Sequence, residues 1–340
     1  MDLHAFQNDK ISNFPYPVRD KAMAKKLVRR KIIIDTDPGQ DDAVAILLAL
    51  SAPEEIDLMA VTTVAGNVPL WRTTENALKI LELGGGTAVP VYSGCARPMR
   101  RQPVTAEHVH GETGLNGVEL PQPKRAAEPI HAVDYLVDTL RKHDPGEITL
   151  CVLGPITNIA MALVKAPDIA AKICEIIWMG GAYFEVGNIT PTAEFNVYVD
   201  PEAADVVLKS GVKLTLVPLD VTHRALCTRE HLARFEALGN RSGRAVSSML
   251  QFSERFDLAK YLWLGAPLHD PCVIAYLLKP DLFSGRHINI VIELNGEFTT
   301  GMTIADWWGV SKRPANASFL RDVDANRFFD FLISRIGHLP

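Results

Sequence analysis

Residues 31–42 have the sequence Lys-Ile-Ile-Ile-Asp-Thr-Asp-Pro-Gly-Gln-Asp-Asp, and this stretch decides the fold of the 340-residue chain. The isoleucines at 32–34 are β-branched and apolar, which predicts a buried parallel strand. Pro38 and Gly39 end the strand, and apolar residues at helical spacing follow from Ala43 to Leu50. The acids between them therefore lie on a turn at the carboxyl end of a strand, where open α/β sheets bind their ligands.

Four carboxylates fall within eight residues of this turn, at Asp35, Asp37, Asp41 and Asp42. A helix N-terminus favours negative charge by only about 0.3–1 kcal/mol, too little to hold four like charges together. The ordinary structural interpretation is that two of the acids cap the helix and the others face water, but capping needs one acid, not four. We expect the others to have raised pKa values or to bind a cation. Oxygen ligands without a nearby Cys or His favour Ca²⁺ or Mg²⁺ over zinc.

Composition excludes several classes of protein. The net charge is −5, which gives no electrostatic reason to bind nucleic acid, and the five cysteines form no CxxC pair, which indicates reduced thiols. No apolar run reaches transmembrane length and no signal-peptide core is present, so we expect a cytoplasmic protein that does not enter membranes. Without a linker or an internal repeat, we expect a polar N-terminal arm at residues 1–30 and one domain at residues 31–340.

Predicted strands alternate with predicted helices along the rest of the chain. Further strands are expected at residues 57–65, 89–92, 147–153, 174–179 and 212–218. Helices are expected at residues 69–83, 129–143, 157–164, 201–210, 271–278 and 324–336. This alternation predicts an α/β fold with a doubly wound, mainly parallel, Rossmann-like sheet. Strands at 288–293 and 299–305 would add a small antiparallel pair, and the long polar segment 93–128 is typical of a functional loop.

Polar residues collect at or just beyond the predicted strand ends, or at a helix start: Asp37, Asn67, Leu153 with its backbone carbonyl, Asn188 and Asp270. Each has an ordinary structural interpretation, since Asn after Gly is common in turns and Asp before Pro commonly caps a helix. Together they predict one crevice rich in carboxylates and amides. Such a crevice suits an uncharged, polyhydroxylated ligand around a cation, whereas a phosphate would need Lys or Arg, and none is obvious here.

Ordered motifs then point to a family. They are Asp35-Thr36-Asp37-Pro38-Gly39-Gln40-Asp41-Asp42, Ala65-Gly66-Asn67, His110-Gly111-Glu112-Thr113-Gly114-Leu115, Gly154-Pro155-Ile156-Thr157-Asn158-Ile159-Ala160, Met179-Gly180-Gly181, Gly187-Asn188, Glu194-Phe195-Asn196 and His269-Asp270-Pro271. In this order they resemble the inosine-uridine-preferring nucleoside hydrolase family over residues 31–336. The resemblance implies the nucleoside hydrolase fold and hydrolysis of the N-glycosidic bond of ribonucleosides, giving ribose and a free base for nucleoside salvage.

The resemblance also implies roles for individual residues. A Ca²⁺ ion would be bound by the carboxylates of Asp37, Asp42 and Asp270 and by the backbone carbonyl of Leu153. Asp37 would also be the general base for metal-bound water, and His269, with an ordinary pKa near 6.5, would protonate the departing base. The remaining contacts would go to the substrate: the 2′ and 3′ hydroxyls to Asp41, Asn67 and Asn196, the 5′ hydroxyl to Asn188 and Glu194, and the base to His110. The family commonly forms homodimers or homotetramers.

Residues 252–268 are expected to form a helix and loop over the cavity, with Arg255, Tyr261 and Trp263 as candidates for contacting the base or as packing residues. Base preference stays open, although His269 favours a broad or purine-accepting enzyme. One alternative is a haloacid-dehalogenase-like phosphatase with Mg²⁺ and Asp35 as nucleophile, but its later strand ends would need a Ser or Thr, a Lys and an acidic pair. The other is a calcium-dependent nucleoside- or sugar-binding protein without turnover.

Overall fold

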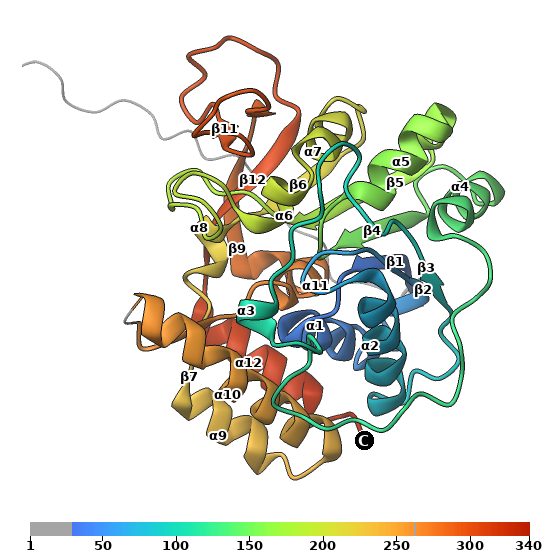
Figure 1. The fold of residues 1–340 in the computed structure, drawn as a ribbon, viewed down its shortest axis with the longest axis vertical. Coiled ribbons are helices and arrows are strands. Elements are labelled where there is room, and N and C mark those ends of the chain that lie inside the picture. Colours follow the sequence, from blue (N-terminus) through green and yellow to red (C-terminus); the bar gives the residue numbers. More distant parts are fainter. Residues whose placement is uncertain (1–28, 262) are drawn as a thin grey trace, which may run out of the picture.

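The computed structural model describes residues 29–261 and 263–340, with an eight-stranded sheet at its centre (Figure 1). The strand order is β3-β2-β1-β4-β5-β6-β12-β9, and every neighbouring pair is parallel except β12 with β9. The strands are β1 (Arg30–Thr36), β2 (Ile56–Thr63), β3 (Val91–Ser93), β4 (Ile148–Val152), β5 (Ile173–Met179), β6 (Leu214–Val217), β9 (Phe283–Ile288) and β12 (Ala317–Val323). The predicted doubly wound, mainly parallel sheet is confirmed.

Strand β1 lies between β2 and β4, as its three buried isoleucines predict. Asp35 is level with Thr62 of β2 and with Val152 of β4, so all three strands end side by side. The residues that follow them in the chain therefore meet at the same edge of the sheet.

Helices cover both faces of the sheet (Figure 1). One face is covered by α1 (Gln40–Leu50), α2 (Leu70–Leu83), α9 (Arg229–Ala237), α10 (Arg241–Tyr261), α11 (Pro271–Leu278) and α12 (Ala325–Ile336). The other face is covered by α4 (Ala132–Lys142), α5 (Thr157–Lys165) and α7 (Pro201–Leu208). Each layer buries its own hydrophobic cluster, as expected for a sheet wound from both sides.

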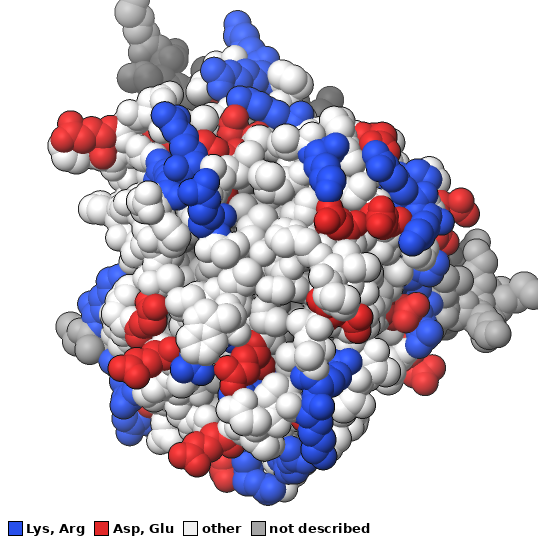
Figure 2. All heavy atoms as spheres, turned by 45° about the vertical axis from the view of Figure 1, so that its right-hand side comes forward, with Lys and Arg blue, Asp and Glu red and all other residues white. Residues whose placement is uncertain are grey.

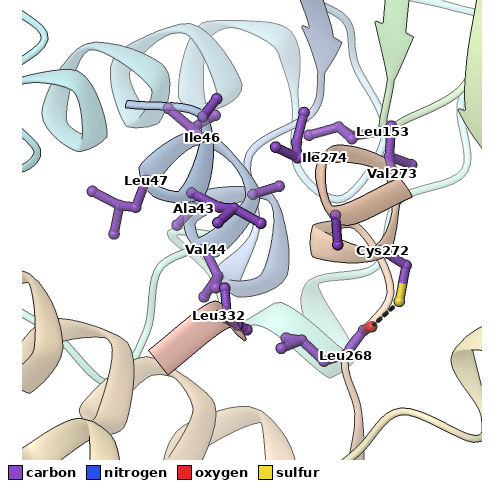
Figure 3. Close-up of a cluster of buried hydrophobic side chains, with 14 of the residues drawn as sticks. Ala43, Val44, Ile46, Leu47, Leu153, Leu268, Cys272, Val273, Ile274 and Leu332 are labelled. Carbon is purple, nitrogen blue, oxygen red and sulfur yellow. Dashed lines mark hydrogen bonds between the residues drawn. The ribbon is translucent and has the colours of Figure 1, made fainter. Parts of the chain in front are cut away.

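Helix α1, which carries two of the acids, is buried on all sides. Its residues from Ala43 to Leu48 have no exposed surface. Figure 3 shows its side chains against Leu332 of α12 and against the start of α11, where the Cys272 thiol donates to the Leu268 carbonyl (3.3 Å). Complete burial stabilises a Leu or Ile side chain by about 1.5–3 kcal/mol, so α1 holds its first turn rigidly.

Two small antiparallel pairs lie outside the main sheet. The predicted pair is confirmed as β10 (Ile290–Ile292) with β11 (Thr303–Ala305), and β7 (Leu226–Thr228) pairs with β8 (Gly265–Pro267). Strands β9 and β12 were not predicted, yet β12 pairs with β6 inside the main sheet. The short helices α3 (Glu107–His110), α6 (Phe195–Val199) and α8 (Leu219–Thr222) lie near the carboxyl edge of the sheet.

Basic and acidic side chains are interspersed on the face in Figure 2. Surface pairs such as Arg141 with Asp168 (2.7 Å) are half exposed and contribute little to stability. No helix within the described ranges is long and apolar enough to cross a membrane. The proposed arm at residues 1–30 lies almost wholly outside the described residues, and the oligomeric state stays a prediction because the structure describes a single chain.

Candidate active site

One cavity opens at the carboxyl edge of the sheet, and every predicted site residue except Asp42 lines it. Its walls come from the segments after β1, β2, β4 and β5, from α3, from the start of α11 and from α10. The predicted residues in the lining are Asp37, Asp41, Asn67, His110, Leu153, Asn188, Glu194, Asn196, His269 and Asp270. The fold thus brings together residues that are far apart in the sequence.

Asp37 is clamped between two glycines. A Cβ atom on Gly66 would lie 2.0 Å from Asp37 Oδ2, and one on Gly154 would lie 2.2 Å from Oδ1. The Asn67 backbone N–H donates to Oδ2 (2.7 Å), while the Asn67 amide donates to the Asp37 carbonyl (3.2 Å). Asp37, which follows β1, is therefore held in one position by groups that follow β2 and β4.

Asp42 lies behind the cavity wall and combines two roles. It accepts from the Gly39 backbone N–H (2.9 Å), which caps α1, and from the Asn67 side chain (3.2 Å) and the Thr36 hydroxyl. The capping interpretation thus holds for one acid of the four. Asp42 also contributes to the acidic group described next.

Carboxylate oxygens of Asp41, Asp42 and Asp270 lie within 4.8 Å of one another. Burial raises the pKa of Asp42, and repulsion from Asp41 raises it further. Burial likewise raises the pKa of Asp37 and Asp270 well above the ordinary value, with repulsion from neighbouring acids added. A bound hard divalent cation would offset both the cost of burying these charges and their mutual repulsion, so the residues present fit such an ion. Asp41, which the sequence predicted as a substrate contact, is thus one of the three acids close enough to share an ion.

Asp35 is separate from the acidic group and does not belong to the described cavity lining. Its Oδ1 accepts from Thr62 (2.5 Å) and Asn158 (2.7 Å), which ties β1 to β2 and to α5. Burial raises its pKa to about 7. A carboxylate enclosed in this way cannot attack a ligand in the cavity, which argues against the phosphatase alternative.

The opposite wall presents side chains that are anchored to the backbone. The Asn196 amide donates to the Leu153 carbonyl (2.7 Å) and to the Met179 carbonyl (3.1 Å). Glu194 caps α6 by accepting from the backbone N–H groups of Asn196 (2.9 Å) and Val197 (3.1 Å). It also accepts from the Gly181 N–H (2.9 Å), and burial raises its pKa to about 7. Asn188 Oδ1 accepts from the Phe195 N–H (2.9 Å). These groups are preorganised, because each keeps its orientation without a ligand.

His110 is oriented by Gln40, a residue whose role the sequence did not reveal. The Gln40 amide nitrogen donates to the carbonyls of His110 (2.9 Å) and Asn116 (3.1 Å). Its oxygen therefore faces His110 Nδ1 at 2.7 Å, and Nδ1 carries the proton. Burial lowers the pKa of His110.

His269 faces the cavity with Nδ1 at 2.7 Å from the Thr222 hydroxyl. The expectation of an ordinary pKa near 6.5 is wrong for this environment. Burial, with His223 and His110 nearby, lowers the pKa to about 3, so the imidazole is neutral at pH 7. At pH 7 His269 can therefore donate or accept a hydrogen bond as a neutral ring, but it is not a positively charged acid.

Comparison with known proteins gives the family. The model of the family "Inosine-uridine preferring nucleoside hydrolase" matches residues 32–330. The chain belongs to this family. Ribonucleoside hydrolases act on N-glycosyl bonds, and the cavity described above lies wholly within the matched range.

Relatives and solved structures cover nearly the whole chain. An uncharacterized protein of Schizosaccharomyces pombe is 52% identical, over 91% of this chain and 100% of that protein. A protein of Shewanella woodyi named as a pyrimidine-specific ribonucleoside hydrolase is 45% identical, over 89% of this chain and 96% of its own. A solved purine-preferring ribonucleoside hydrolase from Gardnerella vaginalis has a TM-score of 0.85 at 34% identity, covering 91% and 98% of the two chains.

Helix α10 forms the cover of this nucleoside hydrolase cavity, as expected for residues 252–268, through Leu250, Ser253, Phe256 and Lys260. Among the candidates on this segment, Arg255 is absent from the described lining and stacks on Phe252 (3.8 Å from guanidinium carbon to ring centroid). Trp263 packs edge-on against His223 (4.8 Å between ring centroids). The Tyr261 side chain lies outside the described residues.

Four further polar side chains in the nucleoside hydrolase cavity were missed by sequence reasoning: His108, His223, Ser253 and Lys260. Lys260 corrects the expectation that the crevice has no obvious cation, and its ammonium donates to the Asn188 carbonyl (2.8 Å). Lys260 lies near the end of a long helix that does not directly follow any strand of the main sheet, so no local signal assigned it to the site. His223 directly follows Thr222 after β6, at a carboxyl strand end that could have drawn attention to it.

Proposed function

We propose that this chain hydrolyses ribonucleosides to ribose and a free base, with Asp37 as the general base. The observation that carries the proposal is the position of Asp37. Its buried carboxylate is clamped by Gly66 and Gly154, close enough to Asp41, Asp42 and Asp270 to be repelled by them, although it is not one of the three acids of the group. Burial and the neighbouring acids raise the pKa of Asp37 without an ion, and a bound cation would favour the ionised carboxylate that can accept a proton from an attacking water. The negative charge of the wall also stabilises the positive charge that develops on the ribosyl C1′ as the base departs.

We propose Ca²⁺ as the cofactor, held by Asp37, Asp42, Asp270 and the Leu153 carbonyl, with Asp41 adjacent. The chemistry of the donors supports calcium, which accepts many oxygen ligands in flexible geometry. When bound, it would supply a fixed positive charge that compensates the acids and makes nearby water more acidic. Asn67 and Asn196 then orient the 2′ and 3′ hydroxyls, and Asn188 and Glu194 the 5′ hydroxyl.

The departing base needs a hydrogen-bond donor, and His269 provides it in this proposal. If the Thr222 hydroxyl donates to Nδ1, the neutral ring carries its proton on Nε2. A neutral imidazole stabilises the developing negative charge of the base by a hydrogen bond. His110, oriented by Gln40, contributes a second contact. The named relatives include pyrimidine-specific and purine-preferring enzymes, so we propose that bases of both classes enter, and that the released base serves nucleoside salvage.

The variant Asp37→Asn tests the enzyme against the binding-only alternative. It keeps the size of the side chain and removes the base, so ribose release should fall by about a hundredfold or more. Binding of inosine, measured by calorimetry at Ca²⁺ concentrations that saturate each protein, should persist within a few-fold. Unchanged turnover in this variant would contradict the mechanism, and absence of turnover in the unmodified protein would favour the binding protein.

A further inference from the structure

His223 is a second imidazole on the cavity wall beside His269. It lines the cavity, its side chain is only 6% exposed, and its ring centroid lies 6.0 Å from that of His269. The preceding residue, Thr222, contacts His269 Nδ1. Two consecutive residues after β6 thus belong to the same part of the cavity. Thr222 contacts His269, and His223 lines the cavity itself.

Glu185 fixes the orientation of His223. Its Oε2 lies 3.1 Å from His223 Nδ1. The loop that carries Glu185 is itself held by Asp220, whose carboxylate accepts from the backbone N–H groups of Phe184 (2.7 Å), Tyr183 (3.0 Å) and Glu185 (3.2 Å). A carboxylate oxygen accepts in this hydrogen bond, so Nδ1 carries the proton. Burial lowers the pKa of His223, and the neutral ring then has its acceptor at Nε2.

We propose that the Glu185–His223 pair recognises the nucleobase: His223 contacts the base in the cavity, and Glu185 sets the tautomer with which it does so. This inference rests on the proposed function and extends it to specificity. A fixed tautomer matters because nucleobases differ in where they place donors and acceptors. Uracil has N3–H and O4, whereas cytosine has an unprotonated N3 and an amino group at C4. An imidazole with a fixed acceptor therefore discriminates between them.

The experiment compares His223→Ala and Glu185→Gln with the unmodified protein at saturating Ca²⁺. Ribose release is measured from uridine, cytidine and inosine, and nitrophenol release from 4-nitrophenyl β-ribofuranoside, whose leaving group needs no recognition as a base. His223→Ala should lower kcat/KM for at least one nucleoside by about tenfold, the effect of one lost hydrogen bond. The uridine-to-cytidine ratio should change by about fivefold or more, while the nitrophenyl substrate changes less than about threefold.

Glu185→Gln separates orientation from contact. An amide at this position can donate to Nδ1 as well as accept, which frees the tautomer, so the uridine-to-cytidine ratio should shift in the same direction by a smaller factor. His231→Gln is the matched control, because His231 stacks on Phe329 (3.9 Å between ring centroids) and is absent from the described cavity lining. It should leave every ratio unchanged. Should His223→Ala fail to fold, as judged by its circular dichroism melt, Glu185→Gln decides the question.

Equal losses on all four substrates would overturn the inference, because a merely structural role lowers every rate alike. Unchanged rates in both variants would overturn it as well. Failure of the proposed function is a different result: the unmodified, folded protein would release no ribose from any nucleoside, and the inference would fall with it. Base-dependent losses in an active enzyme support both.

Discussion

Asp37 depends on the absence of side chains at Gly66 and Gly154, because a Cβ on either would overlap its carboxylate. Gly66→Ala should therefore displace Asp37 and lower kcat by about a hundredfold, the effect of misplacing a catalytic group by about 1 Å. Ribose release from uridine measures this. Gly146→Ala is a control, since Gly146 has a φ of +79° and nothing within 4 Å of its Cβ. It should cost stability but leave kcat unchanged, and equal kcat values for the two variants would contradict the clamp.

At the residue scale, the sequence predicted which residues lie in the site better than it predicted their protonation and their hydrogen-bond partners. The motifs around Asp37, Asn67 and Asp270 assigned residues that the fold does bring into one cavity. The neutral state of His269 could not be predicted, because its pKa depends on burial by segments distant in the sequence. The pairing of Gln40 with His110 escaped for the same reason, since 70 residues separate the partners.

At the element scale, the buried helix α1 carries Asp41 and Asp42 in its first turn, so the packing of α1 in the core fixes the position of both acids. Leu47 has no exposed surface, so Leu47→Ala should lower the free energy of unfolding by about 2–5 kcal/mol through lost burial and a cavity. Urea denaturation measures the change. Val164 on α5 is 53% exposed, and Val164→Ala should alter stability by no more than about 0.5 kcal/mol. Similar effects of the two substitutions would contradict the assigned role of α1.

Element prediction succeeded where the hydrophobic pattern was continuous and failed at one end of the sheet. The three isoleucines of β1 are apolar without interruption, as a strand buried on both faces requires. Strand β12 has buried Phe319 and Leu320 followed by the charged pair Arg321 and Asp322, so neither alternation nor a continuous apolar run indicated a strand. Its partner β9 is mostly exposed at the edge, and the pairing that defines both strands is formed only in the folded sheet.

At the scale of the whole molecule, the buried acids make stability depend on pH, and the proposed Ca²⁺ site would make it depend on calcium as well. Burial raises the pKa of Asp35 and Glu194 to about 7, and that of Asp37, Asp42 and Asp270 also rises. Through these five acids the folded state binds more protons than the unfolded state between about pH 4 and 7. His110, His223 and His269, whose pKa burial lowers, act in the opposite sense below about pH 6.5. The acids outnumber them, so stability in the absence of metal falls as pH rises through this window. Exposed acids with lowered pKa, such as Asp168, act in the opposite sense at lower pH.

The melting temperature in chelator should accordingly fall between pH 5 and 8, and added Ca²⁺ should raise it more at pH 8 than at pH 5. The reason is that a cation stabilises the ionised acids and binds only the folded state. Differential scanning fluorimetry at matched ionic strength measures both trends. A calcium effect that is the same at every pH would show that the acidic group does not bind the ion.

Ribose release from inosine, uridine, cytidine and adenosine, with Ca²⁺ and again after chelation, tests the central claim most directly. The account predicts ribose and free base in equal amounts from at least one nucleoside, loss of release on chelation, and recovery when Ca²⁺ is restored. No release from any of the four by folded, calcium-loaded protein would contradict it, and release that survives complete chelation would contradict the role given to the acidic group.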